Sequence, residues 1–216
     1  RLLDEAGMKL VLVARSKDKL EGLAQNLKSA AVMPLDVTEE AAADEIVQFA
    51  KASFGSVDVL VNNAGMMVVG NVDELDVDKA MAMVRLNVEA AFRLAICTAR
   101  EMKAEGKGFI VNLSSVAGLK SFSGMAVYNG TKFAMEGFSD ALRMELAEAG
   151  VRVGCVAPGT VNTNLFSDWE TDAKDKVSYG GTLQPEDIAR TIHFMLEQPP
   201  YMNVARVFAL PSHHGI

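Results

Sequence analysis

The sequence predicts a doubly wound α/β fold, a parallel sheet with helices on both faces, and three observations support this prediction. Short continuous apolar runs, such as residues 9–14, are typical of strands buried on both faces. Helical segments separate these runs, and parallel neighbours need such crossover connections. Chemically suggestive residues follow directly after the runs, at the strand ends where folds of this class bind ligands.

The expected elements alternate along the whole chain. Residues 1–7 mix charged and apolar side chains, and we expect them to be the last turns of a helix. Apolar runs predict strands at residues 9–14, 31–37, 57–61, 108–113, 151–156 and 204–210. Helices are expected at residues 16–28, with Ser16 as the cap, and at 39–54, 78–103, 126–149 and 185–196. The irregular stretch at residues 162–182, which contains Trp169, is predicted to be a substrate loop or lid.

Composition limits the class of protein. The 216 residues are half hydrophobic, enough for one substantial core, so we expect a single domain over residues 1–216. The net charge is −7 and no basic block occurs, which argues against nucleic acid as a partner. No apolar run reaches the roughly 18 residues of a membrane span. Cys97 and Cys155 lack metal or redox spacing, so we expect no metal site and a reducing, cytoplasmic location.

Tyr128 and Lys132 are the most informative residues for function. Residues four apart lie on one face of a helix, with about 5–6 Å between their Cβ atoms. A lysine ammonium in that position is expected to lower the pKa of the tyrosine and make the phenol a usable proton donor and acceptor. Neither Tyr179 nor Tyr201 has a lysine four residues on. The alternative interpretation is a half-buried tyrosine ring beside a solvated lysine.

Five short motifs follow one another in a fixed order around this pair. They are Asn62-Asn-Ala-Gly65, Asn87, the second serine of Ser114-Ser115, Tyr128-x-x-x-Lys132 and Pro158-Gly159. The second serine precedes the tyrosine by thirteen residues. In order and spacing the chain resembles the single-domain form of the short-chain dehydrogenase/reductase family over essentially its whole length. The resemblance implies a Rossmann-type three-layer sandwich that binds a nicotinamide dinucleotide.

The resemblance also implies a role for each catalytic residue. Tyr128 would exchange a proton with the substrate oxygen, while Ser115 would hydrogen-bond the same oxygen as charge develops. Lys132 would lower the pKa of Tyr128 and hydrogen-bond the nicotinamide ribose. Asn87 would hold a water that leads protons from Lys132 to solvent. The alternative for Asn87 is a helix-interior asparagine bonded to nearby backbone.

Cofactor-binding residues are implied after four of the expected strands. Asp36-Val37 would contact adenine, and the loop Asn63-Ala64-Gly65 would approach the adenosine ribose, unless it is an ordinary turn. After the first strand the chain has Arg15, which suits a 2′-phosphate, so NADP is favoured over NAD. Val161 and Thr163 resemble the positions that hold the carboxamide. The full implied set is Arg15, Asp36, Val37, Asn63, Ala64, Gly65, Tyr128, Lys132, Pro158, Gly159, Val161 and Thr163.

One feature of the family does not occur in these 216 residues: the glycine-rich phosphate-binding turn, together with the strand before it. By resemblance that strand lies between the strands expected at residues 9–14 and 57–61, and its omission would leave two strand edges unpaired. We therefore expect about twenty or more further residues upstream of Arg1, with a Gly-x-x-x-Gly-x-Gly turn. Sequencing the intact N-terminus tests this expectation.

The leading hypothesis is an NADP(H)-dependent oxidoreductase that interconverts a small-molecule secondary alcohol and a ketone by hydride transfer. Residues 183–189 and 200–211 loosely resemble a branch that includes NADP-dependent 3-hydroxy acid dehydrogenases and carbonyl reductases. One alternative is a non-catalytic binding or oligomerisation module, and another is an epimerase or dehydratase of the extended relatives. The family also implies a homodimer or homotetramer, with residues 78–103 and 126–149 as candidate interfaces.

Overall fold

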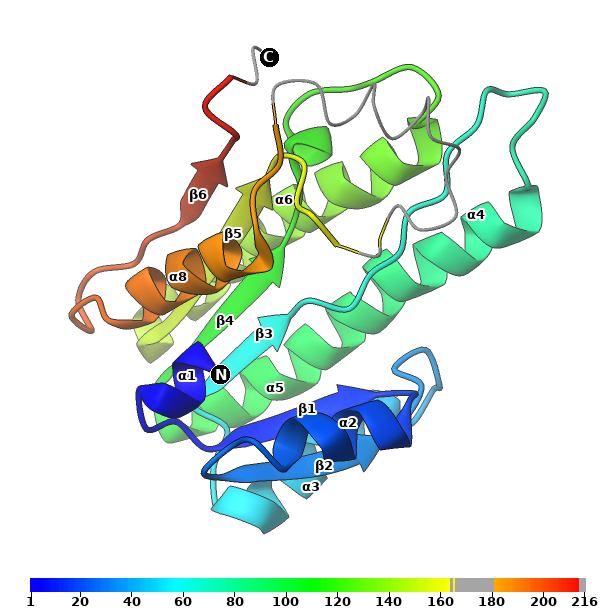
Figure 1. The fold of residues 1–216 in the computed structure, drawn as a ribbon. Helices are drawn as coiled ribbons and strands as arrows, with labels where there is room; N and C mark the ends of the chain where they lie inside the picture. Colours follow the sequence, from blue (N-terminus) through cyan, green and yellow to red (C-terminus); the bar gives the residue numbers. More distant parts are fainter. Residues whose placement is uncertain (164, 166–180, 214–216) are drawn as a thin grey trace.

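A computed structural model of the chain describes residues 1–163, 165 and 181–213. Within these residues all paired strands are parallel, and they form two separate sheets, β1-β2 and β3-β4-β5-β6 (Figure 1). The strands are β1 (Leu10–Ala14), β2 (Ala30–Pro34), β3 (Val59–Asn62), β4 (Gly108–Leu113), β5 (Val151–Pro158) and β6 (Arg206–Ala209). The doubly wound α/β class expected from the sequence is confirmed.

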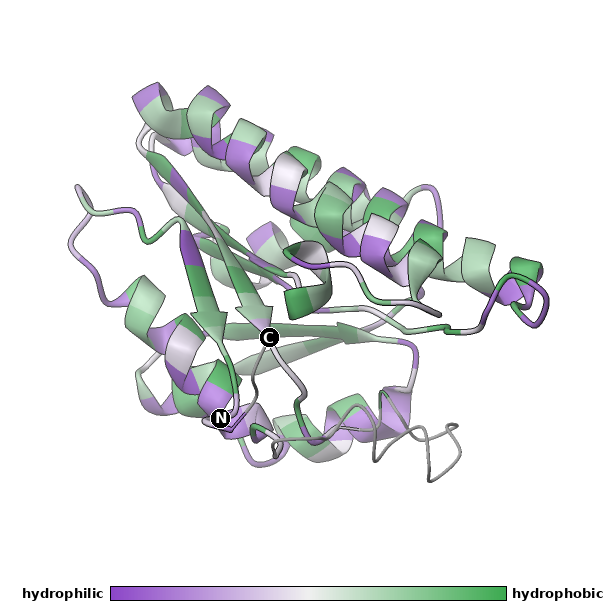
Figure 2. Ribbon diagram, turned by 90° about the horizontal axis from the view of Figure 1, so that it is seen from above, coloured by the Kyte–Doolittle hydropathy of each residue, from purple (hydrophilic) through white to green (hydrophobic). Residues whose placement is uncertain are grey.

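Helices cover both sides of the strands (Figure 1). On one side lie α1 (Leu2–Glu5), α2 (Lys17–Ala24) and α8 (Pro185–Leu196), and on the other lie α3 (Ala42–Phe54), α4 (Val77–Val84), α5 (Ala91–Glu105) and α6 (Ala126–Leu146). A π-helical turn, η1 (Arg85–Ala90), joins α4 to α5, and two 3-10 turns are η2 (Val116–Gly118) and η3 (Ala147–Ala149). Seen from above, the strands are mainly hydrophobic and the helices alternate hydrophobic and hydrophilic stretches (Figure 2).

The central strands form the core because both of their faces are covered by helices. In β4 and β5 the side chains of Ile110, Val111, Val153 and Val156 are completely buried. The two strands pair in register from Gly108 opposite Val151 onward. This confirms the burial expected from continuous apolar runs. For residues 9–14 the expected burial on both faces is wrong: in β1 Leu10–Val13 are only partly buried and Ala14 is exposed, in a sheet of two strands.

The two sheets separate between β1 and β3, which are not hydrogen-bonded to each other in the described part of the chain. By the family resemblance, this is where a further central strand would lie. That strand, and the phosphate-binding turn after it, remain predictions.

Two sequence expectations are corrected in detail, and a third is not tested. The helix expected at residues 78–103 is interrupted by the π-helical turn η1. Ser16 occupies the N-cap position of α2, but its side chain makes no capping hydrogen bond. Most of the predicted substrate loop, including Trp169, lies outside the described residues. None of the helices within residues 1–163 and 181–213 is long and apolar enough to cross a bilayer.

Candidate active site

Tyr128 and Lys132 lie on one face of α6, as their spacing predicted. The Lys132 ammonium nitrogen is 5.7 Å from the centroid of the Tyr128 ring. It donates a hydrogen bond to the carbonyl oxygen of Leu113 at 3.0 Å, at the carboxyl end of β4. Tyr128 is buried, at 5% exposure, against an apolar cluster that includes Met83 and Ala117. The alternative of a half-buried ring beside a solvated lysine is therefore wrong.

Ser115 reaches the tyrosine because the chain leaves β4 in an extended conformation and turns at once into η2. Its hydroxyl oxygen accepts a hydrogen bond from the Ala117 amide at 3.2 Å, which makes Ser115 the cap of that turn. The same side chain is near enough to the phenol of Tyr128 to lower its pKa through a hydrogen-bonding interaction. Since the serine oxygen already accepts one bond, its proton is free to be donated to the phenol oxygen.

The pKa of Tyr128 corrects the sequence expectation. We expected the lysine to lower this pKa, but burial raises it, and only the hydrogen bond from Ser115 opposes the increase. The reason is geometric: the Lys132 ammonium lies beside the ring and donates to Leu113, not to the phenol. The isolated protein therefore holds Tyr128 as a protonated phenol at neutral pH, the form that can donate a proton.

Lys132 is itself affected by the protein interior. Burial lowers its pKa from 10.5 to about 8, against the raising effects of Cys155 and Glu136. At pH 7 the side chain is still mainly an ammonium. The site thus combines a neutral phenol with a cation whose charge is lost within a few pH units above neutrality.

Asn87 lies in the π-helical turn η1 and is buried, at 3% exposure. Its side-chain amide accepts from the Met66 amide at 2.9 Å and donates to the Met66 carbonyl at 2.8 Å. It also donates to the Thr131 hydroxyl of α6 at 3.3 Å. Asn87 is therefore bonded to a loop 21 residues away and not to its own helix. Its role in holding a water remains a prediction.

A chain of buried polar side chains anchors the loop after β3. Asn62 donates to the Ala91 carbonyl at 2.8 Å and to the Asn112 side chain at 3.1 Å. Asn112 in turn donates to the Ser139 hydroxyl of α6 at 2.9 Å. Sequence reasoning assigned function to Asn63 and overlooked Asn62, although the doubled asparagine was a signal that one of the two has a structural role.

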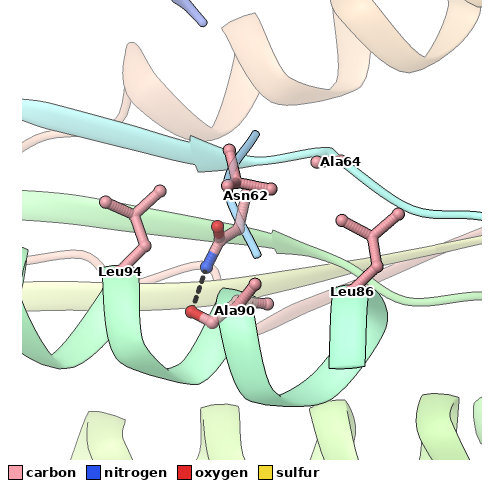
Figure 3. A pocket seen from close by; sticks show the side chains of 7 residues that line it. Asn62, Ala64, Leu86, Ala90 and Leu94 are labelled. Atoms are coloured by element: carbon pink, nitrogen blue, oxygen red, sulfur yellow. Dashed lines mark hydrogen bonds between the residues drawn. The ribbon is translucent and has the colours of Figure 1, made fainter. Parts of the chain in front are cut away.

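Two of the residues predicted to bind adenosine, Val37 and Ala64, line one small hollow. It is lined by Val37, Asn62, Ala64, Leu86, Ala90, Ala91 and Leu94. Figure 3 shows the Asn62 side chain directed toward the helix at Ala90, with Leu94 and Leu86 on either side. Apart from Asn62 the lining is aliphatic. Next to Val37, the Asp36 carboxylate accepts from the Thr38 amide at 3.0 Å and from its hydroxyl at 2.7 Å, and these bonds lower the pKa of Asp36.

Gly65 and Arg15, two more of the predicted cofactor residues, follow the strands β3 and β1. A Cβ atom on Gly65 would lie 3.3 Å from the Asn87 side-chain oxygen, so the glycine permits the close approach of loop and helix. The Arg15 side chain follows β1 and is 81% exposed. Its guanidinium lies 4.0 Å from the Asp36 carboxylate, an exposed contact of little energetic value. The guanidinium is therefore accessible to a ligand anion.

The residues after β5 lie at the same edge of the sheet. The Gly159 amide donates to the Ala209 carbonyl at 2.8 Å, which extends the pairing of Pro158 with that residue in β6. Val161 forms an isolated parallel bridge with Leu183. The Thr163 side chain is exposed, and its hydroxyl accepts from the Leu165 amide at 3.3 Å. Within residues 1–163, 165 and 181–213, no group of three or more His, Cys, Asp or Glu side chains could hold a metal ion.

Comparisons with known proteins agree on one family. A family model described as short chain dehydrogenase matches residues 1–174. An uncharacterized oxidoreductase of Staphylococcus aureus (strain MRSA252) is 32% identical over 212 residues, which cover 97% of this chain and 89% of the relative. An uncharacterized oxidoreductase of Staphylococcus saprophyticus is 32% identical over 214 residues, with the same coverage of both chains.

Solved structures show the same fold. The closed form of a serine dehydrogenase complexed with NADP+ has a TM-score of 0.89 at 26% identity, covering 96% of this chain and 87% of the other. A serine dehydrogenase from Escherichia coli has a TM-score of 0.83 at 26% identity, covering 96% and 88%. Fold and site together define a doubly wound α/β protein with a buried tyrosine–lysine pair. The chain belongs to the short-chain dehydrogenase family and is an oxidoreductase of that family.

Proposed function

We propose that this protein is an NADP(H)-dependent oxidoreductase that interconverts a secondary alcohol and a ketone, with Tyr128 as the general acid and base. The observation that carries the proposal is the buried Tyr128 phenol, hydrogen-bonded by Ser115 and followed one helical turn later by Lys132. A buried, protonated phenol beside a cation is suited to deliver a proton to an oxygen that is gaining negative charge.

In carbonyl reduction, a bound nicotinamide dinucleotide supplies the hydride. Tyr128 then donates its proton to the substrate oxygen, and Ser115 donates a hydrogen bond to that oxygen as charge develops. Lys132 would bind the nicotinamide ribose with its ammonium 5.7 Å from the centroid of the Tyr128 ring. In the oxidative direction Tyr128 would accept the proton of the substrate hydroxyl.

The residues of this chain fit the dinucleotide. Val37 and Ala64, which line the hollow, would contact adenine, and the exposed Arg15 would pair with a 2′-phosphate. Lys132 would hydrogen-bond the nicotinamide ribose, and Val161 and Thr163 would hold the carboxamide. The serine dehydrogenase of similar fold is itself described in complex with NADP+, which supports the choice of cofactor.

A titration of the intact protein tests the proposal. NADPH and NADH are added separately, and binding is followed through the fluorescence of the reduced nicotinamide. We expect NADPH to bind more tightly than NADH. A panel of secondary alcohols, ketones and 3-hydroxy acids, including L-serine, then identifies the substrate through the absorbance of the reduced nicotinamide. An intact protein that binds neither dinucleotide would contradict the proposal and favour a non-catalytic module.

A further inference from the structure

The proposed mechanism leaves one buried carboxylate of α6 without a role. Glu136 lies one helical turn after Lys132 and two turns after Tyr128, so the three side chains follow one face of the helix. The residue is buried, at 6% exposure. Carboxylates are seldom buried unless they are paired, so this one calls for a physical explanation.

Two groups from neighbouring strands hold the Glu136 carboxylate. One oxygen accepts a hydrogen bond from the Arg206 guanidinium of β6 at 2.8 Å. The other oxygen accepts from the Cys155 thiol of β5 at 3.5 Å, within the range for sulfur. The Arg206 side chain is about half exposed, at 49%, whereas the side chain of Glu136 is 7% exposed. Solvent therefore screens the positive charge of Arg206 more than the negative charge of Glu136.

We propose that Glu136 is a positioning residue of the active site: its buried carboxylate, oriented by Arg206, supplies the negative charge that keeps Lys132 cationic behind the tyrosine. The inference rests on the function proposed above, because the reaction needs Lys132 as a cation. It assigns a task to a side chain that touches neither Tyr128 nor the expected position of the dinucleotide.

The groups around Lys132 leave Glu136 as its source of negative charge. The titratable groups that act on it are Tyr128 and Glu136 of α6 and Cys155 of β5, and Arg206 of β6 faces Glu136. Tyr128 is neutral at physiological pH because burial raises its pKa. Burial and the Glu136 charge also raise the pKa of Cys155, to about 12, so this thiol is neutral as well. Glu136 is then the anion that opposes the effect of burial on Lys132.

Glu136→Gln removes the charge and keeps the shape of the side chain. Lysine labelled with 13C at the ε position reports the ionisation of each ammonium by NMR, and a Lys132→Arg variant assigns the Lys132 signal. We expect Glu136→Gln to lower the titration midpoint of Lys132 by about one pH unit. Glu136→Asp, which keeps the charge, should restore most of the shift. An unchanged midpoint in Glu136→Gln would overturn the inference.

Asp140→Asn is the matched control. Asp140 lies one turn further along α6, and its exposed carboxylate pairs with Arg143 at 2.7 Å. The same change from carboxylate to amide should leave the Lys132 midpoint unchanged. If Glu136→Gln alone fails to fold, the double variant Glu136→Gln/Arg206→Gln removes both partners and leaves no unpaired charge. It should move the midpoint in the same direction, and a midpoint equal to that of the wild type would overturn the inference.

A second readout separates this inference from the proposed function. The affinity of each variant for NADPH is measured between pH 6 and pH 10, a range of about two units on either side of the Lys132 midpoint. We expect the affinity to fall with rising pH, and to fall at lower pH in Glu136→Gln than in wild type or Asp140→Asn. A wild-type protein that does not bind NADPH contradicts the proposed function. Binding with identical pH profiles in wild type and Glu136→Gln contradicts only the inference.

Discussion

The side chain of Asn87 pairs with the backbone of Met66 through two hydrogen bonds, one donated to its carbonyl at 2.8 Å and one accepted from its amide at 2.9 Å. The asparagine amide therefore occupies the place that a neighbouring peptide group would take in a sheet. Through this contact the helical segment between α4 and α5 fixes the loop after β3, which is predicted to approach the adenosine ribose.

Asn87→Asp tests this contact. A carboxylate can accept from the Met66 amide but cannot donate to the Met66 carbonyl, which would leave two acceptors facing each other in a buried place. We expect the free energy of unfolding in urea to fall by about 1–3 kcal/mol, and the affinity for NADPH to fall with it. Asn26→Asp is the control, because Asn26 is exposed just after α2 and its side chain donates to the Gly22 carbonyl of that helix. Equal losses in both variants would contradict the special role of the Met66 contact.

Tyr128→Phe tests the proton donor. The phenyl ring preserves the packing against Met83 and Ala117, so we expect the variant to fold and to bind NADPH as the wild type does. Turnover should fall by about 10²–10⁴-fold, because the group that exchanges the proton is gone. Steady-state rates with a substrate found in the panel provide the measurement. Tyr201→Phe, at a tyrosine that is 91% exposed, should keep wild-type turnover, and comparable turnover in Tyr128→Phe would be fatal to the assignment.

Lys132→Met tests the cost of the buried ammonium. The pKa of Lys132 is lowered from 10.5 to about 8 in the folded protein, so at pH 7 the lysine is charged in both states and its burial opposes folding. The methionine variant should therefore be more stable at pH 7, by about 1–3 kcal/mol, while it loses turnover. Urea unfolding at several pH values provides the measurement.

The same variant gives a pH dependence of defined sign. Between pH 8 and pH 10.5 the unfolded wild-type chain binds more protons at Lys132 than the folded chain, so this residue makes stability rise with pH. The advantage of Lys132→Met should accordingly shrink across this interval. Lys120→Met, at an exposed lysine, should show no such trend. A stability difference that is constant from pH 7 to pH 10.5 would argue against a buried charge at Lys132.

Arg15→Glu tests cofactor choice. The exposed guanidinium would pair with the 2′-phosphate of NADP, whereas a glutamate would repel that phosphate and accept from the 2′-hydroxyl of NAD. We expect the NADPH affinity to fall by about tenfold or more while NADH binds as well as before or better. Lys19→Glu is the control for net charge, since Lys19 is exposed on α2 and lies away from the strand end that carries Arg15. A uniform loss for both dinucleotides would contradict a role in selection.

Much of the fold could be predicted because it depends on local patterns. The strand at Gly108–Leu113 and the helix at Pro185–Leu196 were predicted with their observed bounds. Each begins at a glycine or a proline, and its apolar residues follow the spacing of a strand or a helix. The Tyr128–Lys132 contact was predictable for the same reason: helical spacing alone brings the two side chains together.

The remaining features depend on contacts between distant parts of the chain. The predicted lowering of the Tyr128 pKa was wrong, because the spacing of Tyr128 and Lys132 does not reveal that the phenol is buried. The π-helical turn at Arg85–Ala90 accompanies the bonds between Asn87 and Met66, which no local propensity encodes. Glu136 lies four residues after Lys132 in the sequence. The burial of its carboxylate could not be predicted, because it depends on pairing with Arg206, which is 70 residues further on.

The π-helical turn makes the length of this helix more critical than its composition. It holds one residue more than a regular turn, so deleting any single residue from Arg85–Ala90 would allow continuous α-helical bonding from α4 into α5. The two halves of the helix would keep nearly the same relative orientation, because the wider turn accommodates the extra residue. The position of Asn87 relative to Met66 depends on that turn, so the deletion should break the two hydrogen bonds between them. Insertions and deletions here should therefore inactivate the protein even where they improve the helix itself.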